Sequence, residues 1–384
     1  MRFIHTSDWH LGRTLHGRSL IEDQAWWIDR FIELVAERRP DAVVIAGDVY
    51  DRAVPPAEAV ALLDATLTRL IRDVGVPVLM IAGNHDGPER VGFASRVLDE
   101  AGLHVAGVLD ADVRSCVVGT GEDAARFWLL PYADPIETRD ALADPTIRDH
   151  EAAVAACVAL ARSSGAEEWL QVLVTHHFVA GGQCSDSERG LTVGGTGAVT
   201  TGVFEGFDFV ALGHLHRRQT HGDGRIHYPG SALKYAFDEG GQEKAVSLVE
   251  LSPGGAPIIE TIPLGALRDV RRVTGTLAQV LASAALDSRR DDYIEAVLDE
   301  KAMPPDARGR LAEYYPNLMR VGRAIELFEP DADSDEPAAH QVEKMTDEEQ
   351  FERFFSHVTG GALDETQRAL LHELLSERGR GEAR

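Results

Sequence analysis

Five short segments of the sequence combine aspartate, asparagine and histidine at close spacing. They are Asp8-Trp9-His10, Gly47-Asp48, Gly83-Asn84-His85-Asp86, Thr175-His176-His177 and Gly213-His214-Leu215-His216. Carboxylate, amide oxygen and imidazole together suit a borderline divalent ion such as Mn²⁺, Fe²⁺ or Zn²⁺. Asp8 and Asp48 are only two carboxylates, so two divalent ions would keep net positive charge and attract a phosphodiester. The residue types therefore indicate metal-assisted hydrolysis of a phosphoester.

The spacing within two of these segments places donors two residues apart. On extended backbone such residues point to the same side, so Asp8 can act with His10, and His214 with His216. Glycines precede three of the segments, where they allow a tight exit from a strand and close approach of the backbone to an ion. Taken singly, each segment could be an ordinary strand end or a capped turn. Their joint occurrence in order is what favours one shared site.

We expect each of these segments to lie at the end of a β-strand that positions it. The pattern predicts strands at Arg2–Thr6, Ala42–Ala46, Val76–Ala82, Arg126–Leu130, Leu170–Thr175, Phe207–Leu212 and Lys244–Leu251. A helix from Leu20 to Arg38, with Ser19 and Glu22 as a capping box, and another from Pro56 to Asp73 separate the first three. This alternation predicts a layered, largely parallel α/β sheet, in which ligands gather at the carboxyl ends of strands.

The pattern changes near Leu264. We expect a catalytic domain with the metal-type segments at 1–264, a small α+β capping domain that contacts substrate at 265–328, an acidic linker at 329–345 and a helical tail at 346–384. In the tail, Phe351, Phe354, Phe355 and Val358 fall at helical spacing and form one apolar stripe. The stripe predicts a partner-binding helix; the alternative is that the tail folds back on its own core.

The charge balance is unusual for an enzyme that acts on nucleic acid. The 384 residues include 38 Lys and Arg against 63 Asp and Glu, a net charge of −25. Glu329 to Glu349 alone holds nine acidic residues and one lysine. We therefore expect weak DNA affinity from this chain alone, with metal ions and a partner supplying positive charge. The apolar runs are too short to span a membrane, the start lacks a signal-peptide pattern and the three cysteines suggest no disulfide framework, so we expect a cytoplasmic protein.

The amino-acid sequence of these segments resembles that of a known family. His5–Gly12, Ala46–Asp51, Ile81–Asp86, Ala211–His216 and Gly230-Ser231 are similar to the calcineurin-like metallophosphoesterases, and in detail to their SbcD-type nuclease branch. The resemblance implies a layered α/β sheet core with helices outside. It also implies a Mn²⁺-dependent double-strand exonuclease and single-strand or hairpin endonuclease, acting in DNA end processing, repair and recombination. The implied partners are DNA, an SbcC-type coiled-coil ATPase and a second copy of the chain.

The resemblance also implies roles for the candidate residues. One ion would take Asp8, His10, Asp48 and His216, and the other would take Asp48, Asn84, His176 and His214, with Asp48 shared. His85 would orient the phosphate and protonate or stabilise the leaving oxygen, and Asp86 would steer His85. His177 remains an alternative to His176.

Other readings stay open at this point. The same metal site would serve a phosphatase of small molecules or phosphoproteins, and a non-catalytic scaffold is a third possibility. Arg13, His16 and Arg18 could hold DNA phosphates or lie in a solvated loop. The loop Gly181–Gly197, with Arg189, could line the substrate or be a simple surface loop, and we expect His5 to pack in the core.

Overall fold

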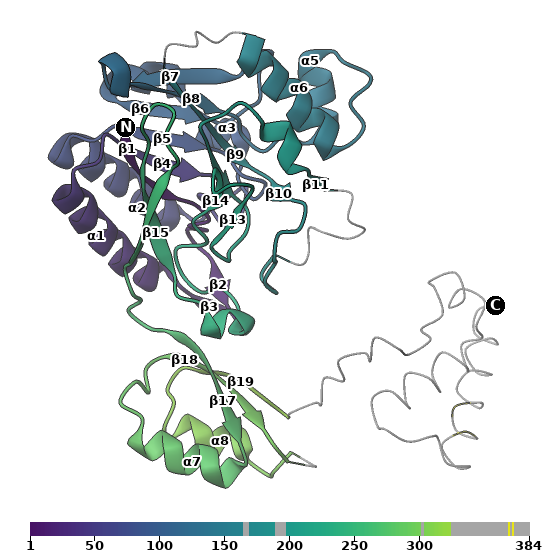
Figure 1. The fold of residues 1–384 in the computed structure, drawn as a ribbon. Helices are drawn as coiled ribbons and strands as arrows, with labels where there is room; N and C mark the ends of the chain where they lie inside the picture. Colours follow the sequence, from purple (N-terminus) through teal and green to yellow (C-terminus); the bar gives the residue numbers. More distant parts are fainter. Residues whose placement is uncertain (164–168, 189–196, 301–302, 324–367, 369–370, 372–384) are drawn as a thin grey trace. The chain divides into compact units, whose positions relative to one another are not determined.

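The first strand of the chain lies in the middle of a six-stranded sheet (Figure 1). In sheet order the strands are β16 (Ile258–Pro263), β15 (Ala245–Glu250), β1 (Arg2–Thr6), β4 (Ala42–Ala46), β5 (Val78–Ile81) and β6 (Leu103–Ala106). Strands β1, β4, β5 and β6 run parallel, whereas β15 and β16 are antiparallel to their neighbours. The strand–helix alternation thus builds the parallel half, as predicted.

A second six-stranded sheet follows. Its strands, in order, are β13 (Gln219–His221), β14 (Ile226–Tyr228), β12 (Phe209–Gly213), β9 (Leu170–His176), β8 (Ala125–Leu129) and β7 (Arg114–Val118). The four central strands are parallel and the two edge strands are antiparallel. The core therefore contains two mixed sheets, where the sequence pattern predicted one largely parallel sheet.

The two sheets pack face to face and carry helices on their outer faces (Figure 1). Between the sheets, the ring centroids of Phe3 and Phe127 lie 5.3 Å apart in an edge-to-face contact. Helices α1 (Ile21–Arg38) and α2 (Ala57–Thr68) cover the first sheet, and α6 (His150–Ser163) covers the second. This layered α/β arrangement confirms the expected fold class.

Helix α1 shows how the sequence specifies these layers. Trp27, Phe31 and Val35 recur at helical spacing and are buried against the sheet. The helix ends at Arg38, and Arg39 adopts a left-handed conformation before Pro40. The predicted capping box is wrong: Leu20 is the N-cap residue, and Ser19 accepts a bond from the backbone of Ile21 instead.

A smaller sheet with its own core follows the two large ones. It consists of the parallel strands β17 (Val270–Gly275), β18 (Tyr293–Leu298) and β19 (Leu318–Arg323), with α7 (Leu277–Leu286) and α8 (Ala307–Ala312). Thr276 and Gln279 form a capping box for α7. Asp23 of α1 accepts hydrogen bonds from Tyr293 Oη at 2.7 Å and Arg268 at 2.9 Å, and so links this part to the two-sheet core.

The described part of the chain also contains short elements. They include the hairpin β2 (Thr14–Leu15) and β3 (Arg18–Ser19), the pair β10 (Phe178–Val179) and β11 (Ala198–Val199), and the helices α3 (Pro88–Val91), α4 (Ser95–Leu98) and α5 (Pro135–Leu142).

The computed structural model describes residues 1–163, 169–188, 197–300 and 303–323, together with 368 and 371. The chain divides into two units, Met1–Ala324 and Ile325–Arg384. The predicted acidic linker, the stripe from Phe351 to Val358 and Arg189 lie outside the described residues. Among the helices that are described, none has the length and apolar character needed to cross a membrane.

Candidate metal centre

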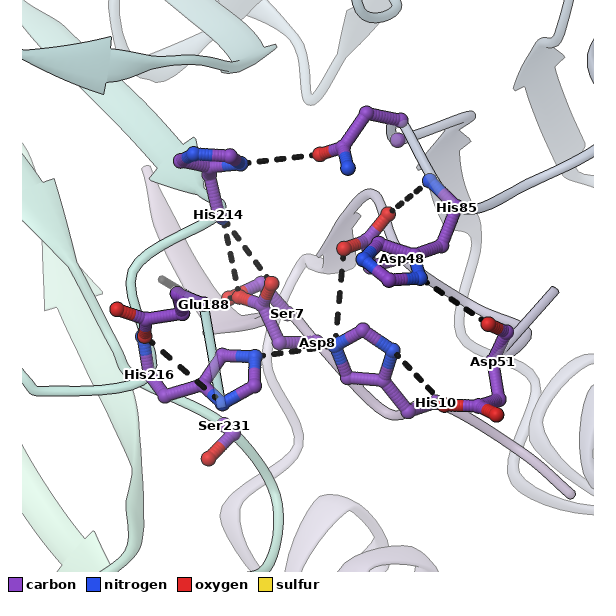
Figure 2. A network of polar contacts seen from close by, with 12 residues as sticks. Ser7, Asp8, His10, Asp48, Asp51, His85, Glu188, His214, His216 and Ser231 are labelled. Atoms are coloured by element: carbon purple, nitrogen blue, oxygen red, sulfur yellow. Dashed lines mark hydrogen bonds and ion pairs between the residues drawn. The ribbon is translucent and has the colours of Figure 1, made fainter. Parts of the chain in front are cut away.

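The polar segments that follow β1, β4, β5 and β12 meet at one place (Figure 2), and the end of β9 joins them there through His176, which lies beside Asp48. Strand β1 leads to Asp8 and His10, β4 to Asp48, β5 to Asn84 and His85, β9 ends on His176, and β12 leads to His214 and His216. Strands β1, β4 and β5 are parallel neighbours in the first sheet, and β9 and β12 are parallel neighbours in the second. Their carboxyl ends therefore lie at the same end of each sheet. The structure therefore brings together every residue that the sequence proposed as a metal ligand.

The spacing argument assumed extended backbone at these residues, but the backbone of four of them is not extended. Asp8, His10, Asp48 and His214 have φ values of 52°, 44°, 48° and 102°. Such positive values are uncommon for residues other than glycine and cost of the order of 1–3 kcal/mol each. Backbone bonds stabilise them: Asp8 N donates to Gly47 O at 3.1 Å, and His10 N donates to Asp48 O at 2.9 Å.

The glycines before the segments have the expected role. A Cβ atom on Gly47 would clash with the ring of His176, one on Gly83 with Asp48, and one on Gly213 with the carbonyl oxygen of Ala46. Only glycine therefore lets these strand ends approach each other closely. The close approach brings the donors of the two sheets within reach of common ions.

The first donor group consists of Asp8, His10 and His216, all buried. Their ligand atoms lie within 4.8 Å of one another. The Nε2 atoms of His10 and His216 are 3.0 Å apart. Asp8 is fixed by the backbone N–H of His214, which donates to its Oδ1 at 3.1 Å, and by the hydroxyl of Ser7.

The second donor group consists of Asp8, Asp48 and His176, whose ligand atoms also lie within 4.8 Å of one another. Asp48 Oδ2 is 3.4 Å from His176 Nε2 and 3.6 Å from His10 Nε2, so this carboxylate faces both groups. Asn84 joins the second group, because its Oδ1 lies 3.1 Å from His176 Nε2 and 3.0 Å from His214 Nδ1. Asp8 also belongs to both groups, which the sequence did not indicate.

The structure separates the two adjacent histidines. His176 Nδ1 contacts the carbonyl oxygen of Ala46 at 2.8 Å, which leaves Nε2 directed at the donors. His177 Nε2 instead accepts a bond from the backbone of Ala133 at 3.2 Å, and its ring stacks on Tyr132. Of the two candidates, His176 is the one positioned to hold an ion.

His85 lies at the partly exposed side of the site. Its backbone N–H donates to Asp48 Oδ1 at 2.9 Å, and its Nδ1 lies 3.1 Å from the carbonyl oxygen of Asp51. Because a carbonyl only accepts, Nδ1 carries a proton in this contact, and Nε2 is left for a substrate. The ring also makes an edge contact with His10, at 4.9 Å between centroids.

The expected side-chain contact from Asp86 to His85 is replaced by another arrangement. The carboxylate of Asp86 accepts from the backbone N–H groups of Gly83 at 2.8 Å, Val49 at 3.1 Å and Tyr50 at 2.8 Å. Asp86 thus ties the loop after β4 to the loop after β5, and Asp51 orients the His85 ring. The position of Asp86 next to His85 in the sequence does not show whether its carboxylate contacts the His85 side chain or the backbone of the two loops.

Burial and close charges shift the pKa values of the site. Burial alone would raise the pKa of Asp48, but the imidazoles of His176 and His10 hold it well below its usual range. Burial would lower the pKa of His176, yet Asp48 and Asp8 raise it to about 9. Burial and the neighbouring His176 lower the pKa of His214 to about 3. Burial raises the pKa of Asp8, so the site combines an anionic Asp48 with converging imidazoles.

This donor set fits divalent cations. Two imidazole nitrogens facing each other at 3.0 Å beside carboxylates need a positive charge or a proton between them. Mixed oxygen and nitrogen donors of this kind bind Mn²⁺, Fe²⁺ or Zn²⁺. Ions bound here would act as Lewis acids on a phosphoester and lower the pKa of an attacking water.

Sequence reasoning missed the polar residues behind His216. Ser187 Oγ contacts His216 Nδ1 at 2.7 Å and donates to Glu239 Oε1 at 2.6 Å. Lys244 forms an ion pair with Glu239. Burial would raise the pKa of Glu239, but Lys244 lowers it to about 2. No local pattern distinguishes Glu239 from the exposed Glu243 beside it, so only the tertiary fold could identify it.

The weaker candidates occupy various places. Arg13 pairs with Asp51 at 3.2 Å and stacks on Tyr235, at the edge of the site. His16 is exposed beside Phe237, and Arg18 donates to Asn317 of the smaller sheet. His5 is completely buried between the sheets, near Phe209 and His227.

Comparison with known families gives two matches in chain order. Residues 1–218 match the model of the calcineurin-like phosphoesterases, and residues 266–359 match the type 5 capsule protein repressor C-terminal domain, SbcD_C. Similar solved structures include TT1561 of Thermus thermophilus, with 14% identity, 69% of this chain and 99% of that chain covered, and a TM-score of 0.40. Another is a dimetal phosphatase from Danio rerio, with 13% identity, 69% and 96% covered, and a TM-score of 0.43.

Proposed function

Because this chain belongs to the calcineurin-like phosphoesterase family, we propose that it is the DNA-cleaving subunit of an SbcCD-type nuclease. The family and the donor groups make it a hydrolase of phosphoester bonds that uses divalent metal ions. The observation that supports the narrower function is the second match, to the SbcD_C domain at 266–359, which lies C-terminal to the phosphoesterase match at 1–218. The substrate would be DNA ends and hairpins in the cytoplasm, and the preferred ion Mn²⁺.

The proposed ligand sets draw on the two donor groups, with Asp8 assigned to the first ion and His214 added to the second through its contact with Asn84. One ion would take Asp8, His10, Asp48 and His216, and the other would take Asp48, Asn84, His176 and His214. Support comes from the 4.8 Å clustering of the ligand atoms and from Asn84 Oδ1, which lies about equally far from His176 and His214. Asp48, which faces both groups, would be the shared ligand.

His85 would act on the substrate rather than on an ion. Its Nδ1–H is held by the carbonyl oxygen of Asp51, so its Nε2 keeps a fixed direction at the open side of the site. From there it can orient the scissile phosphate and, in its doubly protonated form, donate the proton on Nε2 to the leaving oxygen. Asp86 would maintain the geometry of both loops through its three backbone bonds.

The remaining chain would provide substrate contact and partner binding. We propose residues 265–328 as a capping domain beside the catalytic domain 1–264, and the tail 346–384 as the segment that binds a coiled-coil ATPase. A partner is needed because the chain carries a net charge of −25, which disfavours DNA binding by itself. We also propose, from the family resemblance, that two copies of the chain associate.

The deciding experiment compares substrates. With Mn²⁺, and with and without the ATPase partner, the protein is expected to cleave hairpin DNA and to degrade double-stranded ends. A generic aryl phosphodiester serves as the comparison, because any competent site of this kind would hydrolyse it. Hydrolysis of the aryl ester without any cleavage of DNA would favour a small-molecule or phosphoprotein phosphatase. Binding of partner and DNA with neither reaction would favour a scaffold.

The tail has its own test. Deleting residues 345–384 should abolish the stable complex with the ATPase on size-exclusion chromatography, while Mn²⁺-dependent cleavage of a short single-stranded substrate continues. An unchanged complex after the deletion would contradict the proposed role of the tail.

A further inference from the structure

A cluster of buried and half-buried polar side chains lies behind His216. It consists of Ser187, Glu188, Glu239 and Lys244, and we call it the His216 support cluster. The side chains of Glu239 and Lys244 are 0% and 8% exposed, and their charged atoms are 2.6 Å apart. Burying two charges is expensive even when they pair, and apolar residues of similar size would often be at least as stable. The position of this ion pair behind a proposed ligand therefore calls for a functional reason.

One branch of the cluster fixes the imidazole ring. Glu239 is a carboxylate and can only accept, so the single proton of the Ser187 hydroxyl is directed to Glu239 Oε1 at 2.6 Å. The Ser187 oxygen then accepts from His216 Nδ1 at 2.7 Å. This order of donors places the His216 proton on Nδ1 and leaves the Nε2 lone pair directed toward His10 and Asp8.

The other branch fixes the backbone of the same residue. Lys244 Nζ donates to the carbonyl oxygen of His216 at 2.7 Å while it pairs with Glu239 Oε2. Glu188 accepts from the backbone N–H of His216. The ring and the main chain of His216 are therefore held by the same cluster, and Glu239 connects both branches.

We propose that Glu239 is a positioning residue that, through Ser187 and Lys244, sets the tautomer and direction of His216 and thereby the affinity of the first donor group for its ion. The inference rests on the proposed metal site. A residue that fixes a metal-binding imidazole from behind typically changes metal affinity or activity by about 10- to 100-fold when it is replaced. A purely structural ion pair would instead change stability and leave the relative affinities of the two ions as they are.

Glu239→Gln tests this directly in the full-length protein. The amide cannot accept from both Ser187 and Lys244, so the chain of donors to His216 is broken at nearly constant volume. Titration calorimetry with Mn²⁺ should show one ion bound about 10- to 100-fold more weakly and the other within a few-fold of wild type. The Mn²⁺ concentration for half-maximal hydrolysis of an aryl phosphodiester should rise in parallel. Glu239→Asp, which keeps the carboxylate, should recover part of the affinity.

Two further variants complete the experiment. Glu243→Gln removes a nearby exposed carboxylate and should bind both ions as wild type does. Ser187→Ala breaks the same chain without leaving a buried charge unpaired, so it gives the answer if Glu239→Gln fails to fold. It should also weaken one ion selectively.

The contradicting outcomes are distinct. Wild-type affinity for both ions in Glu239→Gln, or in Ser187→Ala where the first variant is unfolded, would overturn the inference. Equal weakening of both ions together with a lower unfolding temperature would overturn it in favour of a structural role. A wild-type protein that binds no divalent ion would contradict the proposed metal site itself, and the inference with it.

Discussion

The Nε2 atoms of His10 and His216 lie 3.0 Å apart, although 206 residues separate them in the sequence. Ser187 Oγ contacts His216 Nδ1 at 2.7 Å, so the Nε2 atom of His216 faces His10. A cation at this place would replace the proton that the two facing nitrogens otherwise need between them. We therefore predict that Mn²⁺ stabilises the folded protein, by about 2.7 kcal/mol at a concentration one hundred times its Kd. Thermal unfolding with and without Mn²⁺ measures this, and an unchanged midpoint would speak against a preformed site.

Metal binding should depend on pH because the ligands must lose protons first. In the protein without ions, the pKa of His176 is raised to about 9, since Asp48 and Asp8 outweigh the effect of burial. Below that pH an ion must displace the His176 proton. The apparent affinity for Mn²⁺ should therefore rise from pH 6 to pH 9 and level off above it. Calorimetry in buffers of different ionisation enthalpy would show release of protons on binding; affinity that falls with rising pH would contradict the assignment of His176.

Replacing His85 should separate catalysis from metal binding. His85→Ala removes the proposed proton donor but none of the proposed ligands, so hydrolysis should fall about 10²- to 10⁴-fold while both ions stay bound. Single-turnover cleavage gives the rate of hydrolysis, and metal titration of the same sample gives the number of bound ions. Normal cleavage, or loss of the ions, would refute the separation of roles.

The residues that could be predicted from the sequence are those with a local signature. Buried strands such as Ala42–Ala46 and the donors after them have one, because apolar runs end at polar segments that begin with glycine. The edge strand Gln219–His221 was missed, since a short, half-exposed polar strand resembles a loop. The positive φ values of Asp8 and Asp48, the Asp51 contact to His85 and the buried pair of Glu239 and Lys244 depend on segments far apart in the sequence. No periodicity or spacing encodes such contacts.

Acid should destabilise the protein through buried histidines outside the site. His227 lies between the sheets beside His5, and burial lowers its pKa to about 3. The folded state thus keeps His227 neutral, whereas the unfolded state binds a proton below about pH 6.5. Stability is therefore lost as the pH falls from 6.5 toward 3, by about 2 kcal/mol at pH 5 for this residue. In urea unfolding, the free energy of unfolding of His227→Gln should fall less between pH 7 and pH 5 than that of wild type. The exposed control His16→Gln should show the same fall as wild type. Equal slopes in all three proteins would contradict the prediction.

Asp48 provides the most direct test of the whole account, because its carboxylate faces both donor groups. The measurement is Mn²⁺-dependent cleavage of hairpin DNA by wild type and Asp48→Ala, with metal content determined on the same samples. The account predicts two bound ions and cleavage in wild type, abolished by excess EDTA, and loss of both ions and of cleavage in Asp48→Ala. Undiminished cleavage in excess EDTA, or an Asp48→Ala protein that keeps both ions, would contradict the two-metal site.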